Sequence, residues 1–467
     1  MISSEGQHGT LAKRSIISPA AASLVLFLEG FVSVSIQMIM LRQLVPFVGY
    51  SINVTSIVIT FFLAALAFGY RAGGRVQRNH LKRIRLNLFT SGILAGVGLS
   101  YICLDAFLRL SSDVTNNHLV GVAFVSVIIL MPLVYLLAQT VVLLIKFRES
   151  GDAAQQAGDT FHISTIGNVI GGLVTTLVVM YFFGVGIAIA LNAAILGAAY
   201  IIVSPGNRPV SVCLAVMLVA LGLIVNVGFE RNAFDRTTAY ANYYTYTSPT
   251  DSSRHLIVNG QDASRTDVNG VGHPYIEHFE TEIFEGGDRN DNVLVLGAGG
   301  FTLGQGRTHS SKITFVDVDE QLRELATVFH GRPDGIQGRF VAEDARAFLL
   351  QQSTPYDHIV LDTFSHQTSV PVHLLTLEFF ELVRGSLTEH GMVHMNYIAS
   401  SEKDSQFRRG IDNTVRAVFG SCSVQRIDAP GTQLYNMLYT CRKSQTDTYR
   451  VIYRDENTKA SVDSGFE

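Results

Sequence analysis

Charge and cysteine are both scarce in this chain. Charged residues make up 16% of its 467 residues, whereas soluble domains usually carry about 25%. The cysteines lie far apart, which argues against a zinc site and against a disulfide framework; they are Cys103, Cys213, Cys422 and Cys441. Cys422 and Cys441 could meet across a hairpin, but we expect buried free thiols. The net charge of -4 favours neither nucleic acid nor an acidic partner.

Several catalytic signatures are missing as well. No glycine-rich loop ends in Lys-Ser or Lys-Thr, which argues against ATP hydrolysis at a P-loop. No Gly-x-Ser-x-Gly motif is present, which argues against a serine hydrolase. Metal-binding histidine spacings are absent too. We interpret the proximity of His273 and His278 as chance, and we expect no metal site.

Long apolar runs fill the first half of the sequence, up to about Gly228. A membrane-spanning helix needs about 20 predominantly apolar residues. The segments of this kind are 20–41, 51–70, 86–107, 119–145, 162–183, 185–203 and 210–228. The first is too long for a cleaved signal peptide, and another segment follows it at once. We therefore expect a tail over 1–19 and a transmembrane bundle of about seven helices over 20–229, in the bacterial inner membrane.

Basic residues indicate the orientation of this bundle. The connection between the second and third segments is rich in them, and the positive-inside rule places it in the cytoplasm. They are Arg71, Arg75, Arg78, Lys82, Arg83 and Arg85. Lys13 and Arg14 place the N-terminus on the same side. Seven spans would leave the C-terminal domain outside the cytoplasm, whereas a re-entrant segment would return it, and the sequence leaves both arrangements open.

Polar residues within the apolar segments need a reason, because their burial in lipid is costly. Glu29, Ser33 and Gln37 stand four apart, so they share one helical face. For Glu29 we keep two interpretations, helix contact with a basic partner or a polar cavity for a substrate or ion. For Gln37 we favour a structural role. Gly167 and Gly171 form a G-x-x-x-G pair, which predicts close helix packing.

Strands and helices alternate in the second half of the sequence. Residues 230–290 are expected to form a linker and a small β element, in which 254–260 is a strand that runs into an Asn-Gly turn. Residues 291–443 contain apolar strands, each followed by a helical segment or a turn, at 293–296, 313–316, 339–342, 358–361 and 391–397. This alternation predicts an α/β Rossmann-like domain with a doubly wound, mostly parallel sheet. A polar tail occupies 444–467.

Glycines and acids stand where these strands end. Ligands of such sheets bind beyond the carboxyl ends of the strands. Gly297 and Gly299 follow the first strand and would let the backbone approach a ligand closely. Asp317 lies 20 residues after Gly297, a spacing at which an acid typically holds ribose hydroxyls. Asp344 and Asp362 end two further strands, so the pattern predicts a nucleoside site.

Three stretches carry a resemblance to a known family. They are Glu29-Gly-Phe with Gln37 and Arg42; Gly167-Asn-Val-Ile-Gly-Gly172; and Asp362-Thr-Phe-Ser, Pro371-Val-His-Leu-Leu-Thr-Leu-Glu-Phe-Phe380, Gly391-Met-Val and Asn396. The region from about Ser253 to Arg442 resembles the spermidine synthases, a branch of the class I S-adenosylmethionine-dependent folds. Nearly the whole chain is similar to the membrane-fused bacterial members, and the last stretch is the most specific.

The resemblance implies a role for each matching residue. The cofactor-binding residues are, from the methionine-derived part through the ribose to the adenine, Gly297 and Gly299, Asp317, and Asp344 with Ala345. Asp362 matches the aspartate that helps to deprotonate the attacking amine, which makes it the implied catalytic base. Tyr275 stands where the family has a Tyr-His-Glu motif and would line the substrate site.

Three positions depart from the family pattern. Gly300 replaces an aspartate that holds the amine of the aminopropyl group, Ser365 replaces a second one that helps to bind the polyamine, and Ile276 replaces the histidine of Tyr-His-Glu. A dicationic polyamine needs acidic partners, because a buried amine without them is strongly disfavoured. The acceptor is therefore not necessarily putrescine. Ser365 and His366 remain candidates for substrate contact.

The expected function is a membrane-bound, aminopropyltransferase-like enzyme that releases methylthioadenosine. Its cofactor would be S-adenosylmethionine or the decarboxylated form, and its acceptor a small or amphipathic molecule. Two alternatives stay open. One is an S-adenosylmethionine-dependent methyltransferase, and the other is a transporter with a nucleoside-sensing soluble domain, although seven helices resemble only half of a large carrier. A homodimer also stays open.

Overall fold

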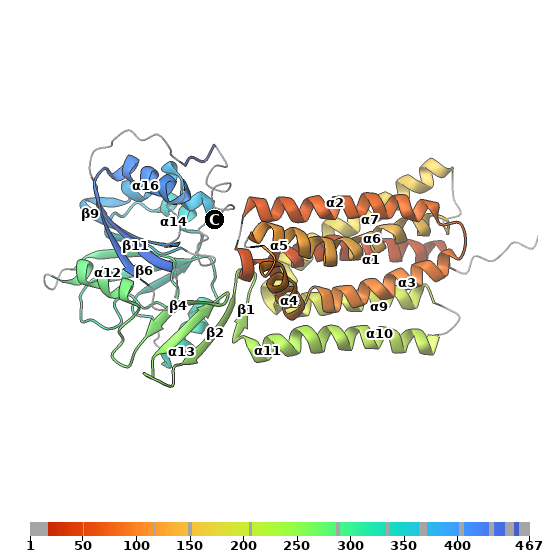
Figure 1. Ribbon diagram of the computed structural model, residues 1–467, viewed down its shortest axis with the longest axis horizontal. Coiled ribbons are helices and arrows are strands. Elements are labelled where there is room, and N and C mark those ends of the chain that lie inside the picture. Colours follow the sequence, from red (N-terminus) through yellow and green to blue (C-terminus); the bar gives the residue numbers. More distant parts are fainter. Residues whose placement is uncertain are drawn as a thin grey trace, which may run out of the picture.

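The computed structural model divides into a long helical bundle and an α/β half at one end of it (Figure 1). The described residues are 17–49, 51–115, 117–147, 152–204, 208–285, 290–332, 336–363, 371–400, 406–428, 434–443 and 453–456. Ser365 and His366 lie outside them, as do most of the tail from 444 and the first 16 residues.

Helices make up the whole of the N-terminal half, and several of them continue through a π-helical turn. They are α1 (Pro19–Val48), α2 (Ile52–Arg75), α3 (His80–Ile93) with η1 (Leu94–Gly98), α4 (Tyr101–Ser112), α5 (His118–Val125) with η2 (Ser126–Leu130) and α6 (Met131–Ile145), α7 (Ala153–Val174) with η3 (Thr175–Met180) and α8 (Tyr181–Phe183), α9 (Val185–Ile202), and α10 (Arg208–Gly222) with η4 (Leu223–Gly228) and α11 (Phe229–Ala233).

Six of these stretches are long and apolar enough to cross a membrane, as the sequence predicts for six of its seven segments. The seventh segment, 86–107, is not one straight helix. It is broken between η1 and α4, whose axes meet at 74°. Ser100 accounts for the break, because its Oγ accepts a hydrogen bond from the Cys103 amide and so caps the start of a new helix. The third predicted segment is therefore a bent pair of helices, either a broken span or a re-entrant segment.

Close contact between α1 and α7 confirms the packing predicted for Gly167 and Gly171. A Cβ at Gly167 would lie 2.3 Å from the carbonyl oxygen of Phe27, and one at Gly171 would lie 2.1 Å from that of Phe31. From the other side, a Cβ at Gly30 would lie 2.1 Å from the Ser164 carbonyl oxygen. The two backbones therefore touch, and only glycine fits at these positions.

A small antiparallel sheet connects the bundle to the main domain. Its strands are β1 (Arg236–Thr237), β2 (Asn242–Thr247), β3 (Arg254–Val258) and β4 (Gln261–Thr266), in that order. Arg42 of α1 donates hydrogen bonds to the Thr238 carbonyl, at 2.9 Å, and to Asn242 Oδ1, at 2.8 Å. Asp319 of the main domain accepts hydrogen bonds from the hydroxyls of Thr238 and Tyr243. The sheet is thus tied to both halves.

The main domain is built on a seven-stranded sheet with the order β10-β11-β9-β8-β5-β6-β7. Its strands are β5 (Asn292–Leu296), β6 (Lys312–Asp317), β7 (Arg339–Ala342), β8 (Tyr356–Leu361), β9 (Leu387–Ser400), β10 (Cys422–Asp428) and β11 (Leu434–Arg442). The five strands from β9 to β7 are parallel to one another, and β10 and β11 form an antiparallel hairpin at one edge. The prediction of a doubly wound, mostly parallel sheet is confirmed.

Two hydrophobic cores cover the two faces of this sheet. One includes side chains of α14 (Ala345–Gln351), α15 (Leu377–Gly385) and α16 (Gln406–Phe419). The other includes α12 (Pro274–Phe284), α13 (Leu322–His330) and part of the small sheet. Buried apolar strand residues face both layers, which explains the nearly continuous apolar runs of β5 and β8 in the sequence.

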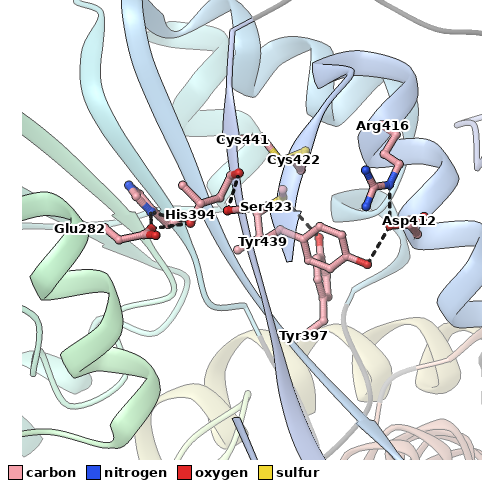
Figure 2. Close-up of a disulfide and its surroundings, with 11 residues drawn as sticks. Glu282, His394, Tyr397, Asp412, Arg416, Cys422, Ser423, Tyr439 and Cys441 are labelled. Carbon is pink, nitrogen blue, oxygen red and sulfur yellow. Dashed lines mark hydrogen bonds and ion pairs between the residues drawn. A yellow bond between two sulfur atoms is a disulfide. The ribbon is translucent and has the colours of Figure 1, made fainter. Parts of the chain in front are cut away.

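A disulfide joins Cys422 of β10 to Cys441 of β11 (Figure 2). The two residues are direct partners in the antiparallel register, with their Cα atoms 4.3 Å apart. The expectation of free thiols at these positions is therefore wrong. The spacing of 19 residues does not predict this disulfide, because the two cysteines meet only when the hairpin has formed. Cys103 and Cys213 are free.

Candidate functional site

A cleft of about 1300 Å³ lies at the carboxyl edge of the seven-stranded sheet. The strand order reverses at β5, whose neighbours are β6 on one side and β8 on the other. Such a reversal leaves a crevice between the loops that follow the two central strands, and ligands of this fold class bind there. The sequence therefore folds so that the ends of β5, β6 and β8 meet in one place.

Most of the residues expected at the site line this cleft together. They are Tyr275, Gly297, Gly299, Asp317, Asp344, Ala345 and Asp362. Glu29 and Gln37 are buried in the bundle and do not line it. The geometry thus separates the nucleoside-site candidates from the two polar residues of the bundle.

Asp362 follows the end of β8 and is held on both carboxylate oxygens. Its Oδ2 accepts a hydrogen bond from the Tyr275 hydroxyl at 2.8 Å, and its Oδ1 accepts one from Asn396 Nδ2 at 2.9 Å. Burial raises the pKa of Asp362 above its ordinary value, and these two hydrogen bonds oppose the rise. The result is an oriented carboxylate that binds a proton more readily than an exposed aspartate.

Asp317 ends β6 and faces the glycine turn. Its Oδ2 accepts a hydrogen bond from the Ala298 amide at 3.0 Å, and its Oδ1 accepts one from the Asp319 amide at 3.1 Å. Burial raises the pKa of Asp317 to about 6, against the effect of these amides. Each oxygen retains a second lone pair, so the carboxylate can still accept hydrogen bonds from the hydroxyls of a ribose.

Asp344 caps the start of α14. Its Oδ1 accepts hydrogen bonds from the amides of Arg346 and Ala347, each at 3.0 Å, and its Oδ2 lies 3.0 Å from Nε2 of His373. Burial acts to raise the pKa of Asp344, but the amides and His373 outweigh it, so the pKa is lowered. A carboxylate at this position is therefore ionised at neutral pH.

The glycine turn leaves no room for side chains at two positions. Gly297 has φ +92°, and a Cβ there would lie 2.1 Å from the carbonyl oxygen of Asp362. The turn therefore packs directly on the loop that carries Asp362. A Cβ at Gly300 would lie 2.7 Å from the Phe329 ring and 2.8 Å from Ser264 Cβ. An aspartate at 300 would require both neighbours to move.

Several residues of the cleft were missed or dismissed in the sequence. Asn396 orients Asp362, and Asn436 donates a hydrogen bond from Nδ2 to Asn396 Oδ1 at 2.7 Å. His273, whose spacing suggested chance, lines the cleft with its Nε2 3.5 Å from Asp262 Oδ1. In the sequence, only Asn396 could have been found, because it belongs to a family motif. The contacts of Asn436 and His273 join elements that are far apart in the chain, so no sequence pattern indicates them.

The remaining acids of the cleft wall each have a basic neighbour. Asp262 lies 2.8 Å from His255 Nδ1 as well as near His273. Asp428 is paired with Arg426 at 2.6 Å, and Asp455 accepts hydrogen bonds from Arg346. Asp428 and Asp455 are therefore already neutralised in part by arginine.

The cleft also reaches the end of the helical bundle. Ser51, Ile52 and Thr55, from the start of α2, belong to its lining. Ile52 is 51% exposed, and Ile59 and Leu63 further along the same helix are also exposed. An apolar surface of the bundle therefore continues from the wall of the cleft along α2.

The polar stripe of the bundle is a separate feature. Glu29 accepts hydrogen bonds from the hydroxyls of Ser33, at 2.7 Å, and of Ser164 on α7, at 3.1 Å. These partners are hydroxyls instead of the basic residue considered from the sequence. Among the described residues, no group of three or more histidine, cysteine, aspartate or glutamate side chains is placed to hold a metal ion.

The strand order and the glycine-and-acid edge define a Rossmann-like domain of the class I type. Comparison with known proteins refines this class. Residues 271–450 match the family described as the spermine/spermidine synthase domain. The C-terminal half of the chain is thus similar to a spermine/spermidine synthase domain.

The similar curated proteins are bacterial polyamine aminopropyltransferases. Polyamine aminopropyltransferase 1 of Streptomyces coelicolor is 24% identical over 385 residues, which are 74% of this chain and 70% of that protein. Polyamine aminopropyltransferase 2 of Pseudomonas aeruginosa is 29% identical over 152 residues, and a probable polyamine aminopropyl transferase of Bifidobacterium longum is 28% identical over 148. The chain spans only 44% and 32% of the length of these last two.

Similar solved structures include two spermidine synthases. A probable spermidine synthase from Corynebacterium glutamicum gives a TM-score of 0.38 at 18% identity and covers 45% of this chain and 79% of that one. Spermidine synthase from Thermotoga maritima gives a TM-score of 0.33 at 15% identity and covers 50% and 84%.

Proposed function

We propose that the protein is a membrane-embedded transferase that moves an aminopropyl-type group from a sulfonium nucleoside to an acceptor amine, with Asp362 as the base. One observation carries the proposal. Asp362 lies at the reversal point of the sheet, held by Tyr275 and Asn396, in the same cleft as the glycine turn, Asp317 and Asp344.

The donor fits the described wall of the cleft. Gly297 and Gly299 remove the side chains that would block a close approach of the ligand to the turn. Asp317 accepts hydrogen bonds from the ribose hydroxyls of the donor, and Asp344 with Ala345 lies beside its adenine. S-adenosylmethionine and its decarboxylated form share these parts, so the proposal covers both donors.

Transfer requires one substitution at carbon. The acceptor nitrogen forms a bond to the carbon next to the sulfonium, the carbon–sulfur bond breaks, and its electron pair returns to sulfur as methylthioadenosine leaves. Asp362 takes the proton that the nitrogen loses. The protein contributes alignment of the two reactants and a positioned base, and the two hydrogen bonds to Asp362 fix the direction from which it accepts the proton.

The acceptor is proposed to carry a single amine and an apolar part. The acid that would help to hold a second ammonium of the acceptor is absent at Ser365, and Asp262, Asp428 and Asp455 of the wall are paired with histidine or arginine. An unpaired buried ammonium is strongly disfavoured. The continuity of the cleft with α2 provides an apolar surface on the acceptor side.

Membrane insertion is part of the proposal. It is supported by the six helical stretches of sufficient length and apolar character and by exposed apolar side chains along α2, α7 and α10. Exposed apolar surface on this scale marks contact with a membrane or another protein. We expect the protein to stay with the membrane after extraction at alkaline pH.

Product analysis tests the proposed reaction. The purified chain is incubated with S-adenosylmethionine or with its decarboxylated form, together with a membrane lipid extract, and the nucleosides are identified by mass spectrometry. We expect methylthioadenosine to accumulate with one of the two donors. S-adenosylhomocysteine as the only product would instead establish a methyltransferase. Binding of both donors without turnover would favour the sensor of a transporter.

A further inference from the structure

The two ends of the helical bundle differ sharply in basic residues, and the α/β half sits at the end that has few. Building on the membrane insertion proposed above, we infer that the α/β half lies on the extracytoplasmic face, so that its cleft draws donor and acceptor from that side. The argument combines the position of each connection, the number of crossings, the charges and the disulfide.

Contacts fix which end of the bundle carries the α/β half. Arg42, near the end of α1, binds Thr238 and Asn242. The ring of Tyr101, at the start of α4, lies 5.4 Å from the ring of Phe234. The ends of α1 and α4 and the starts of α2 and α5 lie at this end, beside the α/β half (Figure 1), and so does Gly184, where an added Cβ would lie 2.8 Å from Thr237 Oγ1.

The other connections meet at the opposite end of the bundle. Lys146 Nζ donates a hydrogen bond to the Val76 carbonyl at 2.9 Å, and Arg85 Nε donates one to the Val203 carbonyl at 2.8 Å. The first contact joins the connection after α2 to the one after α6, and the second joins the first half of α3 to the end of α9. This end lies far from the α/β half (Figure 1).

The bent segment crosses the bundle instead of turning back within it. His80, at the start of α3, lies 2.8 Å from Lys146 at the far end. Leu99, at the end of η1, accepts a hydrogen bond from Gln43 Nε2 at 3.0 Å, next to Arg42 at the α/β end. The bend at Ser100 therefore follows a complete crossing. Seven crossings put the N-terminus and the α/β half on opposite sides.

Basic residues are concentrated at the far end. Among the described residues they are Arg71, Arg75, Arg78, Lys82, Arg83, Arg85, Lys146 and Arg208. The connections at the α/β end, 49–51, 99–117 and 184, contain a single lysine or arginine, Arg109. Since short cytoplasmic loops carry the excess of lysine and arginine, the far end is cytoplasmic and the α/β half is not.

The Cys422–Cys441 disulfide supports the same side independently. Disulfides form and persist in extracytoplasmic, oxidising compartments and are rare in the cytosol. Cys441 is 1% exposed, and the pair closes the edge hairpin of the sheet. A structural disulfide in this domain fits the side that the charges assign.

With the cleft on the extracytoplasmic side, the donor has to be supplied to that side of the membrane. A sulfonium nucleoside carries a fixed positive charge and does not cross a lipid bilayer unaided, because burial of a charge in hydrocarbon is costly. A carrier or channel step must therefore bring the donor to the cleft. The acceptor, in contrast, is available directly from the outer leaflet or from the extracytoplasmic solution.

Cysteine labelling in oriented membrane vesicles tests the orientation. In a background with Cys103→Ser and Cys213→Ser, one variant carries Ser353→Cys on the surface of the α/β half and a matched variant carries Gln77→Cys in the basic connection; both positions are exposed. A membrane-impermeant maleimide is applied to right-side-out and to inside-out vesicles. We expect Ser353→Cys to react fully only in right-side-out vesicles and Gln77→Cys only in inside-out vesicles.

The opposite pattern, or equal reaction of both variants in both vesicle types, would overturn the inferred orientation. The product assay on detergent-solubilised protein is independent of sidedness, so loss of transferase activity there would count against the proposed function instead. A second readout uses the wild-type chain, in which we expect Cys422 and Cys441 to resist alkylation until a reductant is added. Free thiols at these positions in freshly isolated membranes would also overturn the inference.

Discussion

Carboxylates in the two halves of the chain have different partners and different surroundings. In the bundle, Glu29 accepts hydrogen bonds from two serine hydroxyls, between helices whose backbones touch at glycine. In the α/β half, Asp362 is held by a tyrosine and an asparagine at the edge of a cleft. The comparison teaches that a buried acid alone does not identify a reactive site. The two acids differ in that Asp362 lines the cleft and Glu29 does not.

Replacement of the proposed base is expected to give the largest effect. Asp362→Asn keeps the shape of the side chain but removes its ability to take a proton, so turnover falls by about 10²–10⁴-fold. Binding of methylthioadenosine should change little, since Asp317 and Asp344 are untouched. The rate is measured by quenching the reaction at several times and quantifying the nucleoside by mass spectrometry. Glu381→Gln, on the surface of α15, is the control. An Asp362→Asn protein with full activity would remove Asp362 as the base.

A pair of alanine substitutions on α7 tests the other half. Gly171→Ala puts a Cβ 2.1 Å from the Phe31 carbonyl oxygen, so we expect it to destabilise the bundle by about 1–3 kcal/mol. Gly158→Ala, on the same helix, meets nothing within 4 Å and is expected to stabilise by about 0.5–1 kcal/mol. Thermal unfolding in detergent measures both. Equal midpoints for the two variants would contradict the tight α1–α7 contact.

Removal of the tyrosine hydroxyl should shift the pH dependence of the reaction. Tyr275→Phe deletes a hydrogen bond that stabilises the ionised form of Asp362, so the pKa of Asp362, already raised by burial, rises further. Because the ionised form is the active base, the acid limb of the rate profile moves to higher pH, by about one unit. Tyr397→Phe, a buried tyrosine outside the cleft, serves as the control. An unmoved acid limb in Tyr275→Phe would separate Tyr275 from the base.

The smallest expected effect is on the pH dependence of methylthioadenosine binding. Asp317 has a pKa of about 6, so its carboxylate is ionised above that pH and protonated below it. We expect methylthioadenosine to bind several-fold more weakly as the pH falls through about 6, because the protonated acid accepts fewer hydrogen bonds. Calorimetric titration at several pH values measures this. Asp317→Asn should bind weakly at every pH, and a pH dependence that survives in this variant would have another origin.

Much of the fold could be predicted because its signals are local. The alternation of apolar strands with helices predicts the sheet, and the residues that follow β5, β6 and β8 predict the edge at which the cleft lies. These features depend on residues close in sequence. The ends of parallel strands meet at one edge in any such sheet, so Gly297, Asp317 and Asp362 converge without further information.

The features that could not be predicted depend on contacts between distant residues. The Ser100 cap breaks a run that is predominantly apolar on both sides of it, so composition does not reveal it. The Cys422–Cys441 pair and the contact of Asn436 with Asn396 depend on the register of the β9–β11–β10 edge. The crowding around Gly300 by Phe329 and Ser264 comes from two other elements. None of these contacts leaves a spacing pattern in the chain.

The central claim is that the cleft transfers a group instead of only binding or hydrolysing the donor. The most direct measurement uses a donor with ¹³C in the aminopropyl carbons, or in the corresponding carbons of S-adenosylmethionine, and follows the label in membranes that contain the protein. The account predicts that the label appears covalently in an amine acceptor in amounts equal to the methylthioadenosine formed, and that Asp362→Asn abolishes both. Label released only as a free small molecule, or nucleoside bound without any turnover, would contradict it.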